Sequence, residues 1–236
     1  MHHVHLLCLP FAGAGASIYR SWSALAPHIN VLPVQLPGRE QRFIEEAHRD
    51  AHTAADALAQ EVQPRLTPGV PVALFGHSMG AVLAYELTRR LLDRHVPVQH
   101  LWVSGSPSPW APRAYTATGL TDEAFLARVS EFAGYTHEAL QDPDMRALLL
   151  PTLRADVELH EQYRPQSDQP LAVPVTALRG ATDELVSAED LLGWQRATTQ
   201  PLTAAELPGG HMYFLDDPAP LLDRLTQQLL PDSVPA

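Results

Sequence analysis

The segment Gly76-His77-Ser78-Met79-Gly80 constrains the fold of this chain more than any other. It follows the apolar run 72–75, which reads as a buried strand, and it opens the stretch 79–92, in which apolar residues recur at helical spacing. A sharp turn from strand to helix needs small residues at both ends because the two backbones approach closely there. Gly76 and Gly80 meet that need. The segment therefore predicts a strand, a tight turn that exposes the Ser78 hydroxyl, and a helix.

Short apolar runs alternate with helical stretches along the chain, which places helices on both faces of a mostly parallel sheet. With 236 residues the chain can bury one large core, and we predict a single α/β domain over residues 1–236. Strands are expected at residues 4–9, 29–34, 72–75, 101–104, 173–178 and 202–207, and helices at 53–66, 79–92 and 218–230. Six strands in this order are sufficient for one central sheet.

Residues 107–170 interrupt the alternation, since they contain two helical stretches, 122–132 and 144–163, and no convincing strand. An insertion at this point lies above the carboxyl ends of the strands, where loops build the site of an α/β sheet. We expect a mobile helical lid, with a rigid subdomain as the alternative. Pro151 has no backbone N–H and crowds the preceding turn, so a break or kink is expected there.

Charge and composition exclude several classes of function. All 16 basic residues are arginines, so the chain has neither a Schiff-base lysine nor the lysine of a phosphate-binding loop. The formal net charge of −11 argues against a nucleic acid partner, because polyanions are bound through a positive field. Residues 13–18 lack the third glycine of a dinucleotide-binding fingerprint, and we expect no cofactor.

The cysteine content and the hydropathy indicate a soluble, cytoplasmic protein. The single cysteine, Cys8, cannot form an internal disulfide, and no spacing of Cys and His indicates a metal site. The apolar opening 5–16 lacks a basic leader and is interrupted by Pro10, so it reads as a strand and loop rather than a signal peptide. No apolar run approaches the ~20 residues of a membrane-spanning helix.

Ser78 needs a base, because a serine hydroxyl is a weak nucleophile. Hydrolases built on such a turn carry serine, acid and histidine in that order along the chain. His211 follows the last expected strand in the loop Pro208-Gly209-Gly210-His211, and we predict that it is the base. The other histidines considered have simpler interpretations: a frayed terminus for His2, His3 and His5, solvated surface rather than a metal site for His48 and His52, and lid or pocket positions for His137 and His160.

The acid is expected just beyond a strand end between Ser78 and His211. Asp183, in the turn that follows the strand 173–178, satisfies this and would hold the tautomer of His211 without taking its proton. Glu184 is adjacent and is the alternative.

Backbone amides complete the expected catalytic group. The Met79 amide, at the start of the helix, points toward the place where an oxyanion would form. A second donor is expected in the glycine-containing loop after the first strand, and we nominate the amides of Phe11 and Ala12.

Taken together, these residues resemble the type II, or editing, thioesterases of polyketide and nonribosomal peptide biosynthesis, in the α/β-hydrolase superfamily. The resemblance spans nearly the whole chain. One departure is the first loop, which reads Gly13-Ala14-Gly15 where adjacent glycines are expected. The stretches that carry the resemblance are residues 9–15 with Trp22, 35–40, 76–80, 180–186 and 209–214.

The resemblance implies an α/β-hydrolase fold with a lid, and cleavage of acyl groups from the phosphopantetheine arm of a carrier protein by Ser78, His211 and Asp183. We expect a monomer with no cofactor of its own. A carboxylesterase or lipase-like enzyme acting on small esters is the nearest alternative, and a non-catalytic binding protein of the same fold is another. The candidates for the apolar lining of an acyl pocket, which core packing explains equally well, are Phe125, Leu126, Val129, Phe132, Leu148 and Leu149. The candidate arginines for docking a carrier protein are Arg39, Arg42, Arg113 and Arg164.

Overall fold

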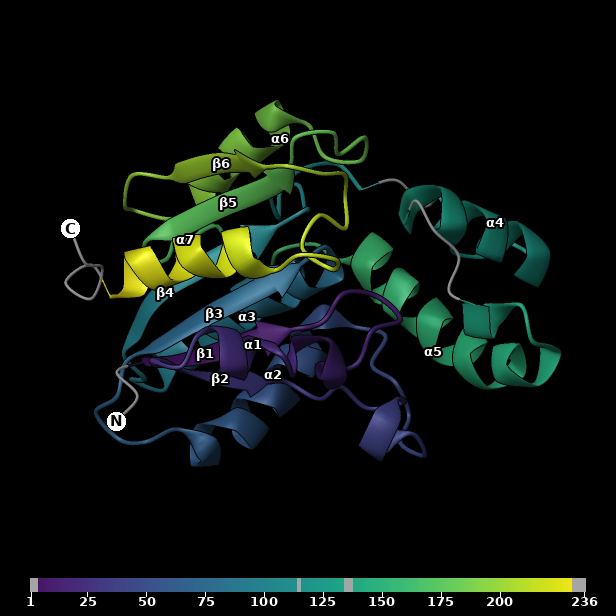
Figure 1. Cartoon of the computed structure of the whole chain (residues 1–236), viewed down its shortest axis with the longest axis horizontal. Coiled ribbons are helices and arrows are strands. Elements are labelled where there is room, and N and C mark those ends of the chain that lie inside the picture. Colours follow the sequence, from purple (N-terminus) through teal and green to yellow (C-terminus); the bar gives the residue numbers. More distant parts are fainter. Residues whose placement is uncertain (1–3, 114–115, 134–137, 231–236) are drawn as a thin grey trace.

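Six strands form one sheet in the order β2-β1-β3-β4-β5-β6, and every pairing between neighbours is parallel (Figure 1). The computed structural model describes residues 4–113, 116–133 and 138–230. The strands are β1 (Val4–Leu9), β2 (Ile29–Pro33), β3 (Val72–His77), β4 (Val98–Ser104), β5 (Val175–Gly180) and β6 (Thr203–Leu207).

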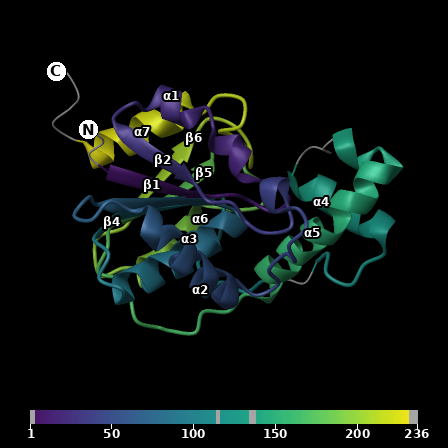
Figure 2. The same ribbon diagram turned by 90° about the horizontal axis from the view of Figure 1, so that it is seen from below.

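Helices cover both faces of this sheet. Figure 2 shows α2 and α3 on one face and α1 and α7 on the other. The helices are α1 (Trp22–Leu25), α2 (Ala51–Val62), α3 (Met79–Asp93), α4 (Asp122–Ala133), α5 (Pro143–Gln162), α6 (Ala188–Leu192) and α7 (Ala219–Leu229), with short 3₁₀ turns at Ala16–Tyr19, Glu40–Arg42, Gln63–Arg65, Glu138–Leu140 and Gly193–Ala197. Within the described residues, no helix combines the length and the apolar character needed to cross a membrane.

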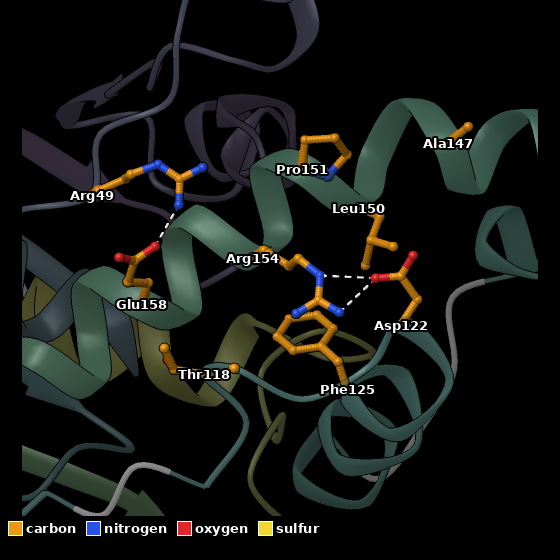
Figure 3. A pocket seen from close by; sticks show the side chains of 10 residues that line it. Arg49, Thr118, Asp122, Phe125, Ala147, Leu150, Pro151, Arg154 and Glu158 are labelled. Carbon is orange, nitrogen blue, oxygen red and sulfur yellow. Dashed lines mark hydrogen bonds and ion pairs between the residues drawn. The ribbon is translucent and has the colours of Figure 1, made fainter.

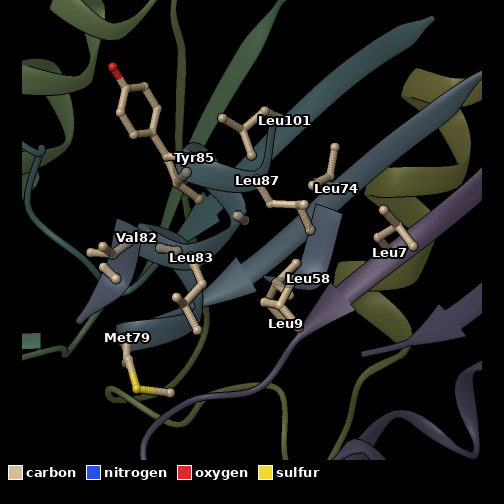
Figure 4. Close-up of a cluster of buried hydrophobic side chains, with 14 of the residues drawn as sticks. Leu7, Leu9, Leu58, Leu74, Met79, Val82, Leu83, Tyr85, Leu87 and Leu101 are labelled. Atoms are coloured by element: carbon tan, nitrogen blue, oxygen red, sulfur yellow. The ribbon is translucent and has the colours of Figure 1, made fainter. Parts of the chain in front are cut away.

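Each face of the sheet has its own apolar core because successive side chains of a strand point to opposite faces. In β1, Leu7 and Leu9 pack with α2 and α3, whereas Leu6 and Cys8 pack with the residues around α7. Figure 4 shows the first of these clusters, in which side chains of β1 and β3 meet those of α3. A sheet buried on both faces needs near-continuous apolar strands, which explains why the short apolar runs are visible in the sequence.

All six expected strands are present, with shifted ends. The strand expected at 101–104 begins earlier, at Val98; the apolar pattern missed its first three residues, which are not buried. The strand expected at 173–178 is displaced to Val175–Gly180. The helix expected at 53–66 is α2, which begins two residues earlier, where Asp50 accepts a hydrogen bond from the Thr53 amide, and ends in a 3₁₀ turn.

The two helices expected in the insertion are α4 and α5, and they lie beyond the carboxyl ends of the strands (Figure 1). Of the break or kink expected at Pro151, the break is absent, since α5 is one helix from Pro143 to Gln162. A proline inside a helix costs about 3 kcal/mol, and contacts on either side of it offset that cost. Leu150 and Leu153 are buried, and the Thr152 hydroxyl donates to the Gly38 carbonyl at 2.8 Å.

A buried polar cluster joins α5 to α2 and α3. Glu86 of α3 is only 2% exposed, accepts a hydrogen bond from the Tyr163 hydroxyl at 2.7 Å, and pairs with Arg90. His52 Nδ1 lies 3.4 Å from the Glu86 carboxylate, and its Nε2 lies 2.8 Å from the Arg164 carbonyl. The expectation of solvated surface was therefore wrong for His52, whose position against α3 has no local signal. The frayed terminus was likewise wrong for His5, which is buried in β1.

The His52 contacts make stability depend on pH. Its hydrogen bond to Glu86 raises the pKa of His52 above its ordinary value, against the opposing effect of burial. A raised pKa stabilises the fold below about pH 6.5 and loses that effect as pH rises through the folded value. We expect His52→Gln to lower the free energy of unfolding by about 1.5–3 kcal/mol at pH 5.5. The loss at pH 8.5 should be smaller, as measured by urea denaturation; an equal loss at both values would contradict the argument.

Candidate active site

The turn at Ser78 joins β3 to α3 through a strained backbone. Ser78 has φ 54° and ψ −118°, a conformation that costs a non-glycine residue about 1–3 kcal/mol. A Cβ on Gly76 would lie 2.0 Å from the Gly80 carbonyl oxygen, and one on Gly80 would lie 2.3 Å from the Leu9 carbonyl oxygen. Both glycines are therefore required by close backbone packing. The Ser78 amide donates to the Ser104 carbonyl at 2.8 Å, which ties the turn to the end of β4.

His211 and Asp183 lie side by side at the same edge of the sheet. His211 Nδ1 is 2.9 Å from Asp183 Oδ2, and the Asp183 side chain is fully buried. The other carboxylate oxygen accepts the amides of Leu185 at 2.9 Å and Val186 at 3.2 Å. Glu184, the alternative acid, is exposed. The structure thus brings Asp183, rather than Glu184, to His211.

The surroundings of Asp183 favour its ionised form. Burial alone would raise the pKa of the Asp183 carboxyl, but the hydrogen bond and charge of His211, together with the two backbone amides, lower the pKa below its ordinary value. An ionised carboxylate at Nδ1 keeps the proton of a neutral imidazole on that nitrogen, which leaves Nε2 free to accept one.

Backbone hydrogen bonds hold the two loops that carry this pair. The Ala181 amide donates to the Leu207 carbonyl at 2.8 Å, and the Thr182 amide donates to the Gly209 carbonyl at 2.9 Å. A Cβ on Gly180 would lie 2.0 Å from the Gly210 carbonyl oxygen, so the loops after β5 and β6 are in direct contact.

The imidazole of His211 packs against the residue that precedes Ser78. The ring centroids of His77 and His211 are 4.8 Å apart. His77 Nδ1 lies 2.9 Å from the Ser104 hydroxyl, which lies 2.8 Å from the Tyr213 hydroxyl. Burial, and then the nearby His211, lower the pKa of His77 well below its ordinary value. His77 is therefore neutral at physiological pH.

The three predicted side chains thus come from the ends of β3, β5 and β6, at one edge of the sheet. Ser78 is partly exposed between two fully buried neighbours, His77 and Met79. In the described part of the chain its hydroxyl makes no hydrogen bond, so the structure places His211 at the turn without a direct bond to Ser78.

The predicted backbone donors belong to the two segments that follow β3 and β1. Met79 is the first residue of α3, so its amide has no carbonyl one turn earlier within the helix. Phe11 and Ala12 follow the end of β1, the neighbour of β3 in the sheet.

Sequence reasoning missed Ser104, which links His77 to Tyr213, and Asp156, which contacts the loop after β1. Ser104 ends a strand in the motif Ser104-Gly105-Ser106, and polar residues at strand ends were a usable signal. Asp156 had none, because an acidic residue in a helix normally marks a solvated face.

A cavity of about 420 Å³ lies beside α4 and α5, and Arg49, from outside the insertion, also lines it (Figure 3). Phe125, Leu150 and Pro151 contribute apolar atoms to its lining, and the pairs Arg154–Asp122 and Arg49–Glu158 lie across it. None of the residues predicted for catalysis lines this cavity.

Comparison with known proteins identifies relatives over the whole fold. The thioesterase domain family matches residues 4–229. The chain is 34% identical over 229 residues to the gramicidin S biosynthesis protein GrsT of Aneurinibacillus migulanus, covering 96% of this chain and 89% of that protein. It is also 34% identical to the thioesterase PikA5 of Streptomyces venezuelae, covering 96% and 81% respectively.

Among solved structures, the type II thioesterase BorB from the borrelidin biosynthetic cluster is similar, with a TM-score of 0.83 and 34% identity over 96% of this chain and 91% of that one. These matches confirm the resemblance and the α/β-hydrolase fold that the residues indicated. The chain belongs to the thioesterase family, and it is a thioester-hydrolysing serine hydrolase.

Proposed function

We propose that this protein is a type II thioesterase that hydrolyses acyl thioesters from the phosphopantetheine arm of carrier protein domains. It would thereby remove aberrant or stalled acyl groups from a polyketide or nonribosomal peptide synthase. The observation that carries the proposal is the His211–Asp183 pair, 2.9 Å apart, packed against the strained Ser78 turn. The relatives named for gramicidin S and borrelidin biosynthesis support the synthase as partner.

In the first half of the reaction, Ser78 Oγ attacks the thioester carbonyl while His211 Nε2 takes the hydroxyl proton. The substrate closes the distance between hydroxyl and imidazole, since such hydrogen bonds often tighten only in the complex. The amides of Met79 and of Phe11 or Ala12 hold the oxyanion. The C–S bond then breaks, and the pantetheine sulfur takes the proton from His211 and leaves as a thiol, which returns the imidazole to its neutral form.

In the second half, a water molecule attacks the acyl-Ser78 ester. His211 removes a proton from that water and returns it to Ser78 Oγ as the ester bond breaks, which releases the free acid. Asp183 stays ionised throughout and stabilises the imidazolium. Ser78, His211 and water carry every proton, so the proposed reaction uses no cofactor.

The helices of residues 107–170 act in this proposal as a lid over the acyl chain. Phe125 is buried in a cluster with Leu150 and Leu153, against which Leu126 and Val129 pack, so these side chains form the interior of the lid itself. Leu148 is 49% exposed and Leu149 is partly buried. The side chain of Phe132 lies outside the described residues.

The arginines offered for carrier docking are all engaged within the protein. Arg39 is buried against Asp156 and cannot reach a partner, so that expectation was wrong. Arg42 pairs with Glu45 and Glu61, Arg113 lies 2.8 Å from His160, and Arg164 donates to backbone carbonyls. We therefore propose that the carrier protein docks through apolar contacts and through arginines that exchange an internal partner for an acidic residue of the carrier.

A carboxylesterase would use the same side chains, and substrate preference separates the two functions. We expect kcat/KM for an acyl group on a carrier protein to exceed that for the same acyl group on N-acetylcysteamine by at least about tenfold, which corresponds to about 1.4 kcal/mol of carrier contacts. The ethyl ester of the same acid should be poorer still. Release of free acid, followed by mass spectrometry, measures all three. A preference for the ethyl ester would contradict the proposal and favour a carboxylesterase.

Ser78→Ala should lower turnover of the acyl carrier by about 10⁵-fold or more, because it removes the nucleophile. An unchanged fold is checked by circular dichroism. Turnover that survives this substitution would instead indicate a binding protein with a contaminating activity.

The choice of acid is tested by neighbouring substitutions. Asp183→Asn removes the charge and allows the wrong tautomer of His211, so kcat should fall by about 10³- to 10⁴-fold. Glu184→Gln, one residue away on an exposed side chain, serves as the matched control and should stay within about threefold of the wild type. Equal losses in the two variants would reject Asp183 as the partner of His211.

A further inference from the structure

The loop after β1 is a tight turn with helix α5 packed on it. The Ala14 amide donates to the Phe11 carbonyl at 3.0 Å, which places Ala12 and Gly13 at the centre of the turn. Gly13 has φ +79°, and a Cβ there would lie 2.9 Å from Leu153 Cδ1 of α5. The turn therefore needs glycine both for its backbone conformation and for the contact with α5.

A buried carboxylate from α5 holds the same turn. Asp156 Oδ2 accepts the Gly13 amide at 2.8 Å and Arg39 Nη1 at 2.6 Å, while Oδ1 accepts Arg39 Nη2 at 2.7 Å. Arg39 Nη1 also donates to the Ala14 carbonyl at 3.0 Å. The side chains of Arg39 and Asp156 are 7% and 2% exposed. The pair thus clamps the turn at both the Gly13 amide and the Ala14 carbonyl.

Among the residues that the structure describes, two backbone amides of this turn already donate hydrogen bonds, and two do not. The Gly13 amide is taken by Asp156 and the Ala14 amide by Phe11. In the described part of the chain, the amides of Phe11 and Ala12 make no hydrogen bond, so they remain as the donors available to an oxyanion.

Energetics favour a positioning role over a purely stabilising one. A buried ion pair loses the solvation of both charges, and apolar replacements of similar volume are often equally stable. Because burying Arg39 and Asp156 costs solvation free energy, we explain the presence of this pair by the backbone geometry that it imposes. Here that geometry is the conformation of the turn that follows β1, beside the Ser78 turn.

We propose that Asp156, oriented by Arg39, is a positioning residue that sets the Phe11–Ala12 amides for the oxyanion and couples the seating of α5 to this arrangement. Asp156 and Leu153 are three residues apart on one face of α5 and contact the same turn. Movement of α5 away from the core would remove both contacts together. The inference rests on the proposed function, since it assigns a role within that reaction.

Asp156→Asn tests this role, because the amide keeps the size of the side chain and cannot accept both prongs of Arg39. We expect kcat for hydrolysis of p-nitrophenyl acetate to fall by about 10- to 100-fold, somewhat less than the loss of a whole oxyanion donor, with KM within about threefold. The inhibition constant of phenylboronic acid, whose adduct with Ser78 places an oxygen in the oxyanion site, should rise by a similar factor. Arg39→Lys keeps the charge but loses the two-pronged contact, so it should lower kcat and raise the inhibition constant in the same way. It replaces Asp156→Asn in the test if that variant does not fold.

Glu86→Gln is the matched control. Glu86 is also a carboxylate that is 2% exposed, pairs with an arginine and ties α5 to the core, but it contacts Tyr163 rather than the turn after β1. We expect it to lower the melting temperature about as much as Asp156→Asn while kcat stays within about threefold. Equal kcat losses in the two variants would overturn the positioning role. If Asp156→Asn lowers kcat and weakens boronic acid binding as expected, but the protein prefers simple esters to acyl carriers, only the proposed substrate is overturned.

Discussion

The close approach of β3 and α3 at Ser78 is the constraint on which the site depends. The turn leaves no room for a side chain at Gly76 or Gly80, and it forces Ser78 to a positive φ. Such strain persists only where the surroundings determine the backbone completely. Here the buried faces of β3 and α3 supply that support, since Phe75, His77 and Met79 are fully buried.

A parallel sheet explains how three distant segments reach this turn. The carboxyl ends of neighbouring parallel strands lie at one edge, so loops after β1, β3, β5 and β6 can share a site. The buried carboxylate at this site has a hydrogen-bond partner for each of its oxygens. Asp183 uses both oxygens, on His211 and on the amides of its own turn, which fixes the imidazole without an exposed charge.

The insertion is joined to the core by polar contacts as well as by apolar packing. Asp156 accepts the Gly13 amide in the turn after β1, and Thr152 donates to Gly38. Tyr163, the residue that follows α5, donates to Glu86, so α5 is tied to the rest of the fold at two points along its length and once at its end. Directional contacts of this kind specify one seated position of the helix, whereas apolar packing alone tolerates small displacements. The helix α4, by contrast, packs through Phe125 on the cluster that α5 supplies.

The sequence alone predicted the fold class, the positions of the strands along the chain, the Ser78 turn, and His211 with Asp183 or its neighbour Glu184, between which the structure decided. These features depend on apolar periodicity, on glycine at tight turns and on chain order, all of which are local. Tertiary structure decided what local patterns do not contain. His52 was predicted to lie on solvated surface, Asp156 was not singled out, and Pro151 was expected to break or kink its helix. The contacts that decide these positions join residues 34 to 117 positions apart, since His52 meets Glu86, Asp156 meets Arg39, and Thr152, beside Pro151, donates to Gly38.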